Sequence, residues 1–327
     1  MTLLIGTDEA GYGPNLGPLM VAATVWRIEA GMEDAEPVLG RALAEVEGLV
    51  AAHAGTQSPL WADSKQIYRA GAGFDMLERG VLLGLLLSAG DIPDTWATLH
   101  DSLGPISPRG GCRGEWQGLT SLRLPCDVDA DRCAVLGATV RDTLTRHGVA
   151  VVRVACRGIY PDEFNTLLHG GLNKSDILSA ATLDLAASLR ADRPDTPALV
   201  WCDRHGGRKR YGGLVASHFD TPLVQPLEET PVRSAYLVPA GGEPRSAACR
   251  IEFCVGGESR APVALASMTA KYVRELSMLA FNAFWAERVP GLLPTAGYPT
   301  DALRWRQDTA AAVARERIAT DDLWRRA

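Results

Sequence analysis

The sequence has no hydrophobic run that could cross a bilayer, since no apolar stretch reaches about 18 residues. It also has no basic segment followed by an apolar run behind Met1, so we expect no signal peptide. From these two absences we expect a cytoplasmic protein that has no membrane partner.

Paired cysteines, paired histidines and excess positive charge are also missing. The seven cysteines are scattered and never spaced as C-x-x-C, which favours reduced thiols over a disulfide framework or a zinc site. The six histidines form no spacing pattern, and we expect His205 to be a loop residue. The formal charge of −6 argues against a non-specific nucleic-acid coat protein, although an enzyme with one basic face remains compatible with it.

What remains is an ordinary globular composition, 327 residues with 46% hydrophobic and 22% charged residues. That length suits one large domain or two small ones. From residue 149 onward the pattern alternates between strand and helix, which is typical of an α/β fold. We predict strands at 3–5, 19–26, 149–155, 198–202, 235–239 and 250–255, and helices at 74–90, 173–189, from Pro262 onward and at 301–327.

The stretch 5–18 is the most unusual part of the chain. A short apolar strand ends in Asp8 and Glu9, and a turn rich in glycine and proline follows. Successive strand residues point to opposite faces, so these two acids share one site only if the strand ends there. Gly11 and Gly13 would let main-chain N–H groups approach a phosphate or a sugar. The alternative is a simple glycine turn with two solvated acids.

Two further acids stand at comparable places. Asp203 ends an apolar strand and precedes the basic loop 204–210, and Glu258 precedes the helix that has Pro262 in its first turn. Carboxylates that converge at strand ends suit hard cations with oxygen ligands. Two such ions about 4 Å apart can activate a water and stabilise the leaving oxygen of a phosphodiester. The acids of 127–131 lack the glycine and glutamate of a calcium loop, so we expect them to begin a helix.

These motifs, in this order, resemble the type 2 ribonucleases H, the bacterial ribonucleases HII and HIII. The resemblance covers most of the chain outside about 27–60, 100–148 and 232–255. It rests on Gly6-Thr7-Asp8-Glu9-Ala10-Gly11-Tyr12-Gly13-Pro14 with Leu16-Gly17-Pro18, on Asp63-Ser64-Lys65, on Val200-Trp201-Cys202-Asp203, on Gly257-Glu258-Ser259-Arg260 with the helix 266–275, and on Gly297-Tyr298-Pro299-Thr300.

Three departures from the family pattern stand out. Tyr12 occupies the position of arginine in type HII and of threonine in type HIII. Glu258 replaces the fourth aspartate of type HII, as in the type HIII set. The sequence also contains no counterpart of the N-terminal substrate-binding domain that is typical of type HIII.

The resemblance implies a ribonuclease H-like mixed sheet flanked by helices, with a C-terminal helical extension. The catalytic domain would span 1–303, with inserted segments at about 27–60, 100–148 and 232–255, and 304–327 would form the C-terminal helix. It further implies a monomeric, divalent-metal-dependent endoribonuclease that cuts the RNA strand of RNA–DNA hybrids to 5′-phosphate and 3′-hydroxyl ends. The alternatives are a related nuclease for another nucleic acid, such as structured DNA, and a catalytically silent nucleic-acid-binding protein.

The resemblance also assigns roles to individual residues. Two Mg²⁺ or Mn²⁺ ions would be held by Asp8, Glu9, Asp203 and Glu258. Backbone groups of Gly11, Tyr12 and Gly13 would read the ribose 2′-hydroxyl, and Tyr298 would stack beneath the sugar. Phosphate contacts would come from Lys65, Arg208, Lys209, Lys271 and the final helix, although a solvated surface explains these basic residues equally well. We also expect Lys271 and Arg274 to lie on a polar side of their helix, opposite an apolar stripe from Leu265 to Leu279.

Overall fold

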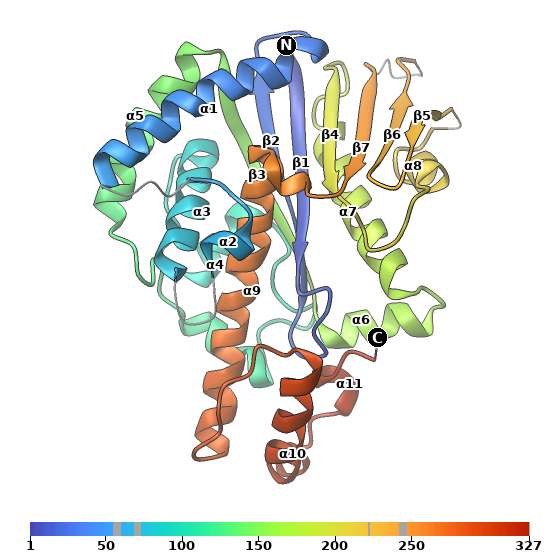
Figure 1. Ribbon diagram of the computed structural model, residues 1–327. Helices are drawn as coiled ribbons and strands as arrows, with labels where there is room; N and C mark the ends of the chain where they lie inside the picture. Colours follow the sequence, from blue (N-terminus) through green and yellow to red (C-terminus); the bar gives the residue numbers. More distant parts are fainter. Residues whose placement is uncertain (55–59, 69–72, 222, 242–246, 327) are drawn as a thin grey trace.

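The computed structural model describes residues 1–54, 60–68, 73–221, 223–241 and 247–326. Its centre is one seven-stranded sheet with the order β3-β2-β1-β4-β7-β6-β5, flanked by helices (Figure 1). β1 is antiparallel to β2 and parallel to β4, so the mixed α/β sheet predicted from the sequence is confirmed. The strands are β1 (Thr2–Ala10), β2 (Leu19–Ile28), β3 (Val149–Ile159), β4 (Ala198–Asp203), β5 (Gln225–Glu229), β6 (Arg233–Val238) and β7 (Cys249–Cys254).

β1 and β2 form a long hairpin at the middle of this sheet. Their pairing continues to Ala10 opposite Met20, whereas the pairing of β1 with β4 ends at Thr7 opposite Cys202. The last residues of β1 therefore have a strand neighbour on one side only. This open edge is where the acids Asp8 and Glu9 lie.

The long helix α9 (Ala261–Arg288) covers one face of the sheet, and its first turn lies directly on β1. A Cβ atom added to Gly6 would stand 2.2 Å from the carbonyl carbon of Pro262, so only glycine allows this approach. Leu4 packs into the core on the α9 side, whereas Leu3 and Ile5 pack into a second core under α7 (Lys174–Ala191) and α8 (Gly212–His218).

Most of the remaining helices lie beside the β3 end of the sheet (Figure 1). They are α1 (Met32–Ala54), α2 (Ser64–Ile67), α3 (Phe74–Ala89), α4 (Trp96–Leu103), α5 (Ala130–Arg146) and α6 (Pro161–His169), with a 3₁₀ helix at Gly114–Ser121. The expected segment 27–60 is thus largely α1, and its residues 55–59 lie outside the described residues. No helix in the described part of the chain is long and apolar enough to cross a membrane.

The segment 232–255 holds the hairpin that the sequence predicts, since β6 pairs antiparallel with β7. β7 also pairs with β4, so the hairpin extends the central sheet. The edge strand β5 was not predicted because its sequence, with Pro226 and two glutamates, has no apolar alternation. Proline and charge are common on edge strands, where they discourage pairing with another chain.

The predicted single helix at 301–327 is wrong. α10 (Pro299–Glu316) ends at Arg317, whose φ of 57° is left-handed and breaks the helix. After the short α11 (Thr320–Leu323) the chain turns back toward the loop that follows β1, and the Arg325 N–H donates to the Asn15 carbonyl at 2.8 Å. In Figure 1 the C-terminus accordingly lies beside α6 and α11.

Candidate active site

Asp8 and Asp203 lie side by side at the carboxyl ends of two parallel strands. The pairing between β1 and β4 ends at Thr7 opposite Cys202, and Asp8 and Asp203 are the next residues of the two strands. Burial raises the pKa of the Asp8 carboxyl well above its ordinary value, and the charges of Glu9 and Asp203 raise it further. A hydrogen bond from Ser267 of α9 acts in the opposite direction but does not cancel the rise. Burial and the neighbouring carboxylates therefore oppose the ionisation of Asp8.

Glu9 shares this site although β1 does not end before it. The expectation that the strand must end there is wrong, because β1 pairs with β2 through Ala10. Burial raises the pKa of Glu9 to about 7, with further upward contributions from Asp203 and Glu258. Side chains from the two faces of β1 can reach the same site here because β4 does not continue alongside Glu9.

Glu258 joins the acids from a 3₁₀ turn (Gly257–Ser259) just before α9. The Gly257 N–H donates to Asp203 Oδ1 at 2.9 Å, which ties this turn to the end of β4. Burial and the charges of Asp203 and Asp63 raise the pKa of Glu258. Its Oε2 atom is buried and has no hydrogen-bond partner, so it is free to bind a cation.

Lys65 supplies positive charge to this cluster. Asp63 caps α2 by accepting the Lys65 N–H at 2.9 Å, which directs the start of the helix toward the acids. Burial lowers the pKa of the Lys65 ammonium group, but Asp63, Glu258, Asp8 and Asp203 together raise it by more. The lysine is exposed to solvent and lies beside the acids.

The glycine loop, residues 11–14, adjoins the acids. Gly11 has a φ of +87°, and a Cβ there would stand 2.5 Å from the Pro18 carbonyl oxygen. Burial and Glu9 raise the pKa of Tyr12, while Arg208 lowers it, so this ring lies between the acids and the basic loop after β4. Gly13 faces the ring of Tyr298, which is 51% exposed.

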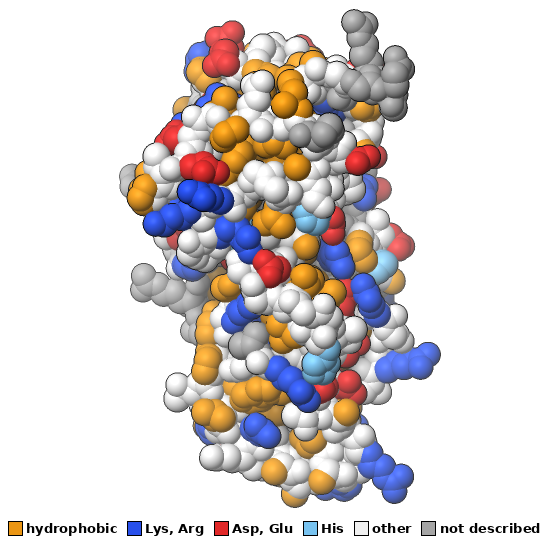
Figure 2. Space-filling view, turned by 90° about the vertical axis from the view of Figure 1, so that its right-hand side faces the viewer, with side chains coloured by type: hydrophobic (Ala, Val, Ile, Leu, Met, Phe, Trp, Pro, Cys, Tyr) orange, Lys and Arg blue, Asp and Glu red, His pale blue; other side chains and the backbone are white. Residues whose placement is uncertain are grey.

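The predicted phosphate contacts fall into two groups. Lys209 is exposed, whereas Arg208 pairs with Asp176 at 2.5 Å and Lys271 pairs with Glu275 at 2.8 Å. Basic side chains also stand among acidic ones across the face in Figure 2, without forming one block. Phosphate binding by Arg208 or Lys271 would therefore compete with an existing ion pair.

Two arginines that the sequence assigned to polar or substrate-facing positions are buried. Arg274 is 1% exposed and donates to the Ala296 carbonyl at 2.8 Å, whereas Leu279 of the expected apolar stripe is 51% exposed. Arg325 of the final segment is also 1% exposed, so it is not a phosphate contact. Burial of these residues depends on carbonyls supplied by distant loops, which helical spacing does not reveal.

Sequence reasoning also missed Ser267 and Lys174. Ser267 belongs to the family-like helix segment but carries no charge that would single it out. The Lys174 ammonium group lies 4.8 Å from the centre of the Tyr12 ring, at the first turn of α7. The only sequence signal for Lys174 is its place after the capping residue Asn173.

The donor set fits hard divalent cations, although the side chains are not arranged as a finished metal site. Among the described residues, no group of three or more His, Cys, Asp or Glu side chains is placed to hold a metal ion. One Asp8 oxygen accepts the Glu9 N–H at 2.8 Å. The donors are nevertheless all carboxylate oxygens, and Glu258 Oε2 is buried without a partner, so ion binding requires the side chains to turn toward the ion.

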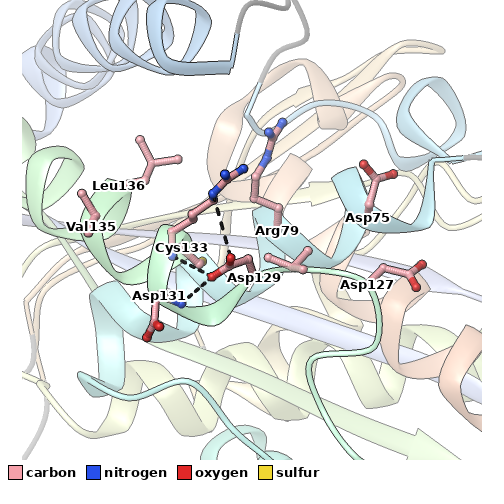
Figure 3. A pocket seen from close by; sticks show the side chains of 10 residues that line it. Asp75, Arg79, Asp127, Asp129, Asp131, Cys133, Val135 and Leu136 are labelled. Atoms are coloured by element: carbon pink, nitrogen blue, oxygen red, sulfur yellow. Dashed lines mark hydrogen bonds and ion pairs between the residues drawn. The ribbon is translucent and has the colours of Figure 1, made fainter.

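A separate pocket of about 780 Å³ lies between the starts of α3 and α5 (Figure 3). Asp129 caps α5 there by accepting the N–H groups of Asp131 and Arg132 at 3.0 and 3.1 Å. The prediction that these acids begin a helix is confirmed. None of the four acids of the candidate active site lines this pocket.

No family model matches the sequence, and no curated protein matches it. The fold is similar to ribonuclease HII in its complex with PCNA from Archaeoglobus fulgidus, with 13% identity, a TM-score of 0.44, and coverage of 99% of this chain and 94% of the other. Ribonuclease H2 from Pyrococcus horikoshii OT3 is 13% identical with a TM-score of 0.43, and the match covers 98% of this chain and 92% of the other. Bst-RNase HIII in complex with Mn²⁺ is 14% identical with a TM-score of 0.40, and the match covers 99% of this chain and 66% of the other. Likenesses this low add no weight to a functional assignment.

Proposed function

We propose that this protein is a divalent-metal-dependent endoribonuclease that cuts the RNA strand of RNA–DNA hybrids and leaves 5′-phosphate and 3′-hydroxyl ends. One observation carries the proposal. Beside a glycine loop, burial raises the pKa values of Asp8, Glu9 and Glu258, and the charge of Asp203 at the end of β4 raises each of them further. Such a cluster is costly to bury unless it binds cations, and its oxygen donors suit Mg²⁺ or Mn²⁺.

In this proposal Asp8, Glu9, Asp203 and Glu258 hold two ions. Bound there, the ions would supply an activated water and stabilise the leaving oxygen of the phosphodiester. Glu9, whose pKa is about 7, carries a proton for part of the time near neutral pH and gives it up when a cation binds.

Substrate recognition falls to the loop and its neighbours. The N–H groups of Tyr12 and Gly13 are suited to the ribose 2′-hydroxyl oxygen, the group that distinguishes RNA from DNA. The exposed ring of Tyr298 next to Gly13 is suited to stacking beneath the sugar. Lys65 and Lys209 are exposed and can reach phosphates, and Arg208 and Lys271 can do so after leaving their carboxylate partners.

The test compares three matched duplexes, RNA–DNA hybrid, duplex RNA and duplex DNA, each with Mg²⁺ and with Mn²⁺. We expect cleavage of the hybrid only, within its RNA strand, by a protein that elutes as a monomer in size-exclusion chromatography with light scattering. Cleavage of duplex DNA would favour a nuclease for another nucleic acid. Tight hybrid binding without any cleavage, in either metal, would favour a silent binding protein.

A further inference from the structure

Arg325 is buried beneath the glycine loop, on a segment that contributes no acid to the site. Its side chain is 1% exposed. Its Nη2 atom donates to the Gly11 carbonyl at 2.6 Å and also to the Pro14 carbonyl. One guanidinium group thus binds the carbonyls at both ends of the loop.

Backbone pairing aligns Arg325 with the loop. The Arg325 backbone N–H donates to the Asn15 carbonyl at 2.8 Å, and the Asn15 side-chain amide donates to the Arg325 carbonyl at 3.1 Å. Leu16 and Trp324 form an antiparallel bridge next to these contacts. These contacts therefore fasten the segment that carries Arg325 to the residues just after the loop.

A second anchor comes from α6. The Asn165 side-chain amide donates to the carbonyls of Asp321 and Trp324 at 2.9 and 2.8 Å, and its oxygen accepts the Arg326 N–H at 3.0 Å. The ring of Phe164 lies 5.0 Å from the Arg325 guanidinium carbon. These contacts fix Arg325 on two sides and leave its side chain little freedom.

The contact with the Gly11 carbonyl sets the direction of a neighbouring donor. In a trans peptide unit the C=O and N–H bonds point in opposite directions, so the Tyr12 N–H points away from Arg325. Within the described residues, the N–H groups of Tyr12 and Gly13 have no hydrogen-bond partner. The guanidinium group thus holds the Gly11 and Pro14 carbonyls toward the protein interior, and the N–H groups of Tyr12 and Gly13 remain available to a ligand.

Gly11 depends on its contacts to keep this arrangement, because glycine adopts many backbone conformations at little cost. Its φ is +87°, and a Cβ added there would stand 2.6 Å from Nε of Arg274. Hydrogen bonds from charged donors are roughly twice as strong as neutral ones. Replacing Arg325 by an apolar side chain would release both carbonyls and let the Gly11–Tyr12 peptide rotate.

We propose that Arg325 is a positioning residue that fixes the Gly11–Tyr12 peptide with its N–H toward the substrate and thereby sets the preference for ribose over deoxyribose at the cleaved nucleotide. The preference for ribose rests on the proposed function, whereas the fixed orientation of the Gly11–Tyr12 peptide is independent of it. Arg325 makes this contribution without touching the nucleic acid.

The test compares Arg325→Met and Arg325→Lys with a control, Arg132→Met, on an exposed arginine of α5. We expect Arg325→Met to speed amide hydrogen exchange at Tyr12 and Gly13 and to lower kcat/KM on the hybrid about tenfold or more, mainly through kcat. Arg325→Lys keeps the charge, but its ammonium nitrogen ends one bond short of the Nη2 position that donates to both carbonyls, so we expect an intermediate loss. Should Arg325→Met fail to fold, Arg325→Lys decides.

Salt dependence separates positioning from phosphate binding. A direct phosphate contact contributes about 0.9 to the slope of log K against log salt on duplex nucleic acid. We expect that slope, and the affinity for duplex DNA, to be the same in all three variants and the unmodified protein. Unchanged amide exchange in a folded Arg325 variant, or a slope reduced by about 0.9, would overturn the proposal. If the unmodified protein cuts no hybrid, the proposed function fails, while the exchange measurement still decides the role of Arg325.

Discussion

At Asp203, one carboxylate affects both the chemistry and the stability of the site. Its charge raises the pKa values of Asp8, Glu9 and Glu258, which means that it opposes their ionisation. The same carboxylate is a candidate metal ligand. These two effects have opposite signs when Asp203 is neutralised, which makes the residue informative.

We expect Asp203→Asn to abolish cleavage, because removing a ligand charge costs several kcal/mol of transition-state stabilisation in a two-metal site. We also expect the metal-free variant to melt at the same or a higher temperature than the unmodified protein, because a repulsive charge is gone. Cleavage rate and Tm are measured together, with Asp195→Asn as an exposed control. Near-normal hydrolysis by a well-folded variant would reject the assignment.

Glu258 leads to a prediction about metal preference. Its side chain is one methylene longer than aspartate, and the extra length must be taken up by the backbone or by a shifted ion. Magnesium demands near-octahedral geometry, whereas manganese tolerates distortion. We expect higher turnover with Mn²⁺ than with Mg²⁺ at saturating metal, and a shift toward Mg²⁺ in Glu258→Asp. Equal or faster turnover with Mg²⁺ in the unmodified protein would count against this assignment.

Tyr12 leads to a prediction about substrate preference. Tyrosine has one hydroxyl and no fixed charge, so anchoring of a lone ribonucleotide should be weaker than with the arginine of type HII enzymes. We expect a higher kcat/KM on runs of several ribonucleotides than on a lone ribonucleotide in duplex DNA. Because Lys174 lies 4.8 Å from the ring, Tyr12→Arg introduces a like charge, and we expect the combination with Lys174→Gln to favour the lone ribonucleotide more than Tyr12→Arg alone. A preference of the unmodified protein for the lone ribonucleotide would show that Tyr12 is not the discriminator.

At the scale of elements, strong local periodicity made some parts predictable. The strand ending at Asp203 and the helix α7 follow apolar patterns that their own residues determine. The strand β5 and the break at Arg317 have no such pattern. The burial of Arg274 was missed for a different reason: its acceptors come from residues 16 and 296, which only the folded chain brings together.

The 3₁₀ helix at Gly114–Ser121 gives a pH prediction. Burial raises the pKa of Glu115 from 4.5 to about 7, and the charges of Asp322 and Asp162 contribute. Because the pKa of Glu115 is higher in the folded than in the unfolded chain, its protonated form contributes its full stability below pH 4.5. This contribution is lost as the pH rises through about 7. The shift corresponds to about 3 kcal/mol for one group.

We therefore expect Glu115→Gln, which stays neutral, to gain about 3 kcal/mol in unfolding free energy relative to the unmodified protein between pH 4.5 and pH 8. Urea unfolding at several pH values measures this difference. Glu47→Gln, at an exposed position of α1, is the control and should run parallel to the unmodified protein. A parallel course for Glu115→Gln as well would mean that Glu115 ionises normally in the folded state.

At the scale of the whole molecule, the candidate site combines segments from both ends of the chain. The four acids could be singled out as candidates from the sequence because each stands at the end of a predicted strand or at the start of a helix. The contribution of the last segment could not, because a buried arginine and a solvent-exposed one look alike in a sequence. Only the tertiary fold shows that Arg325 contacts a loop 314 residues away.

This contact across the chain has a consequence for synthesis on the ribosome. The guanidinium group that holds the carbonyls of the glycine loop emerges 314 residues after Gly11. Until that moment the loop's carbonyls have no partner from the final segment, and its donors have no fixed direction. A nascent chain would therefore carry Asp8 and Glu9 long before it carried the guanidinium group that, in our proposal, orients the loop toward a ribose.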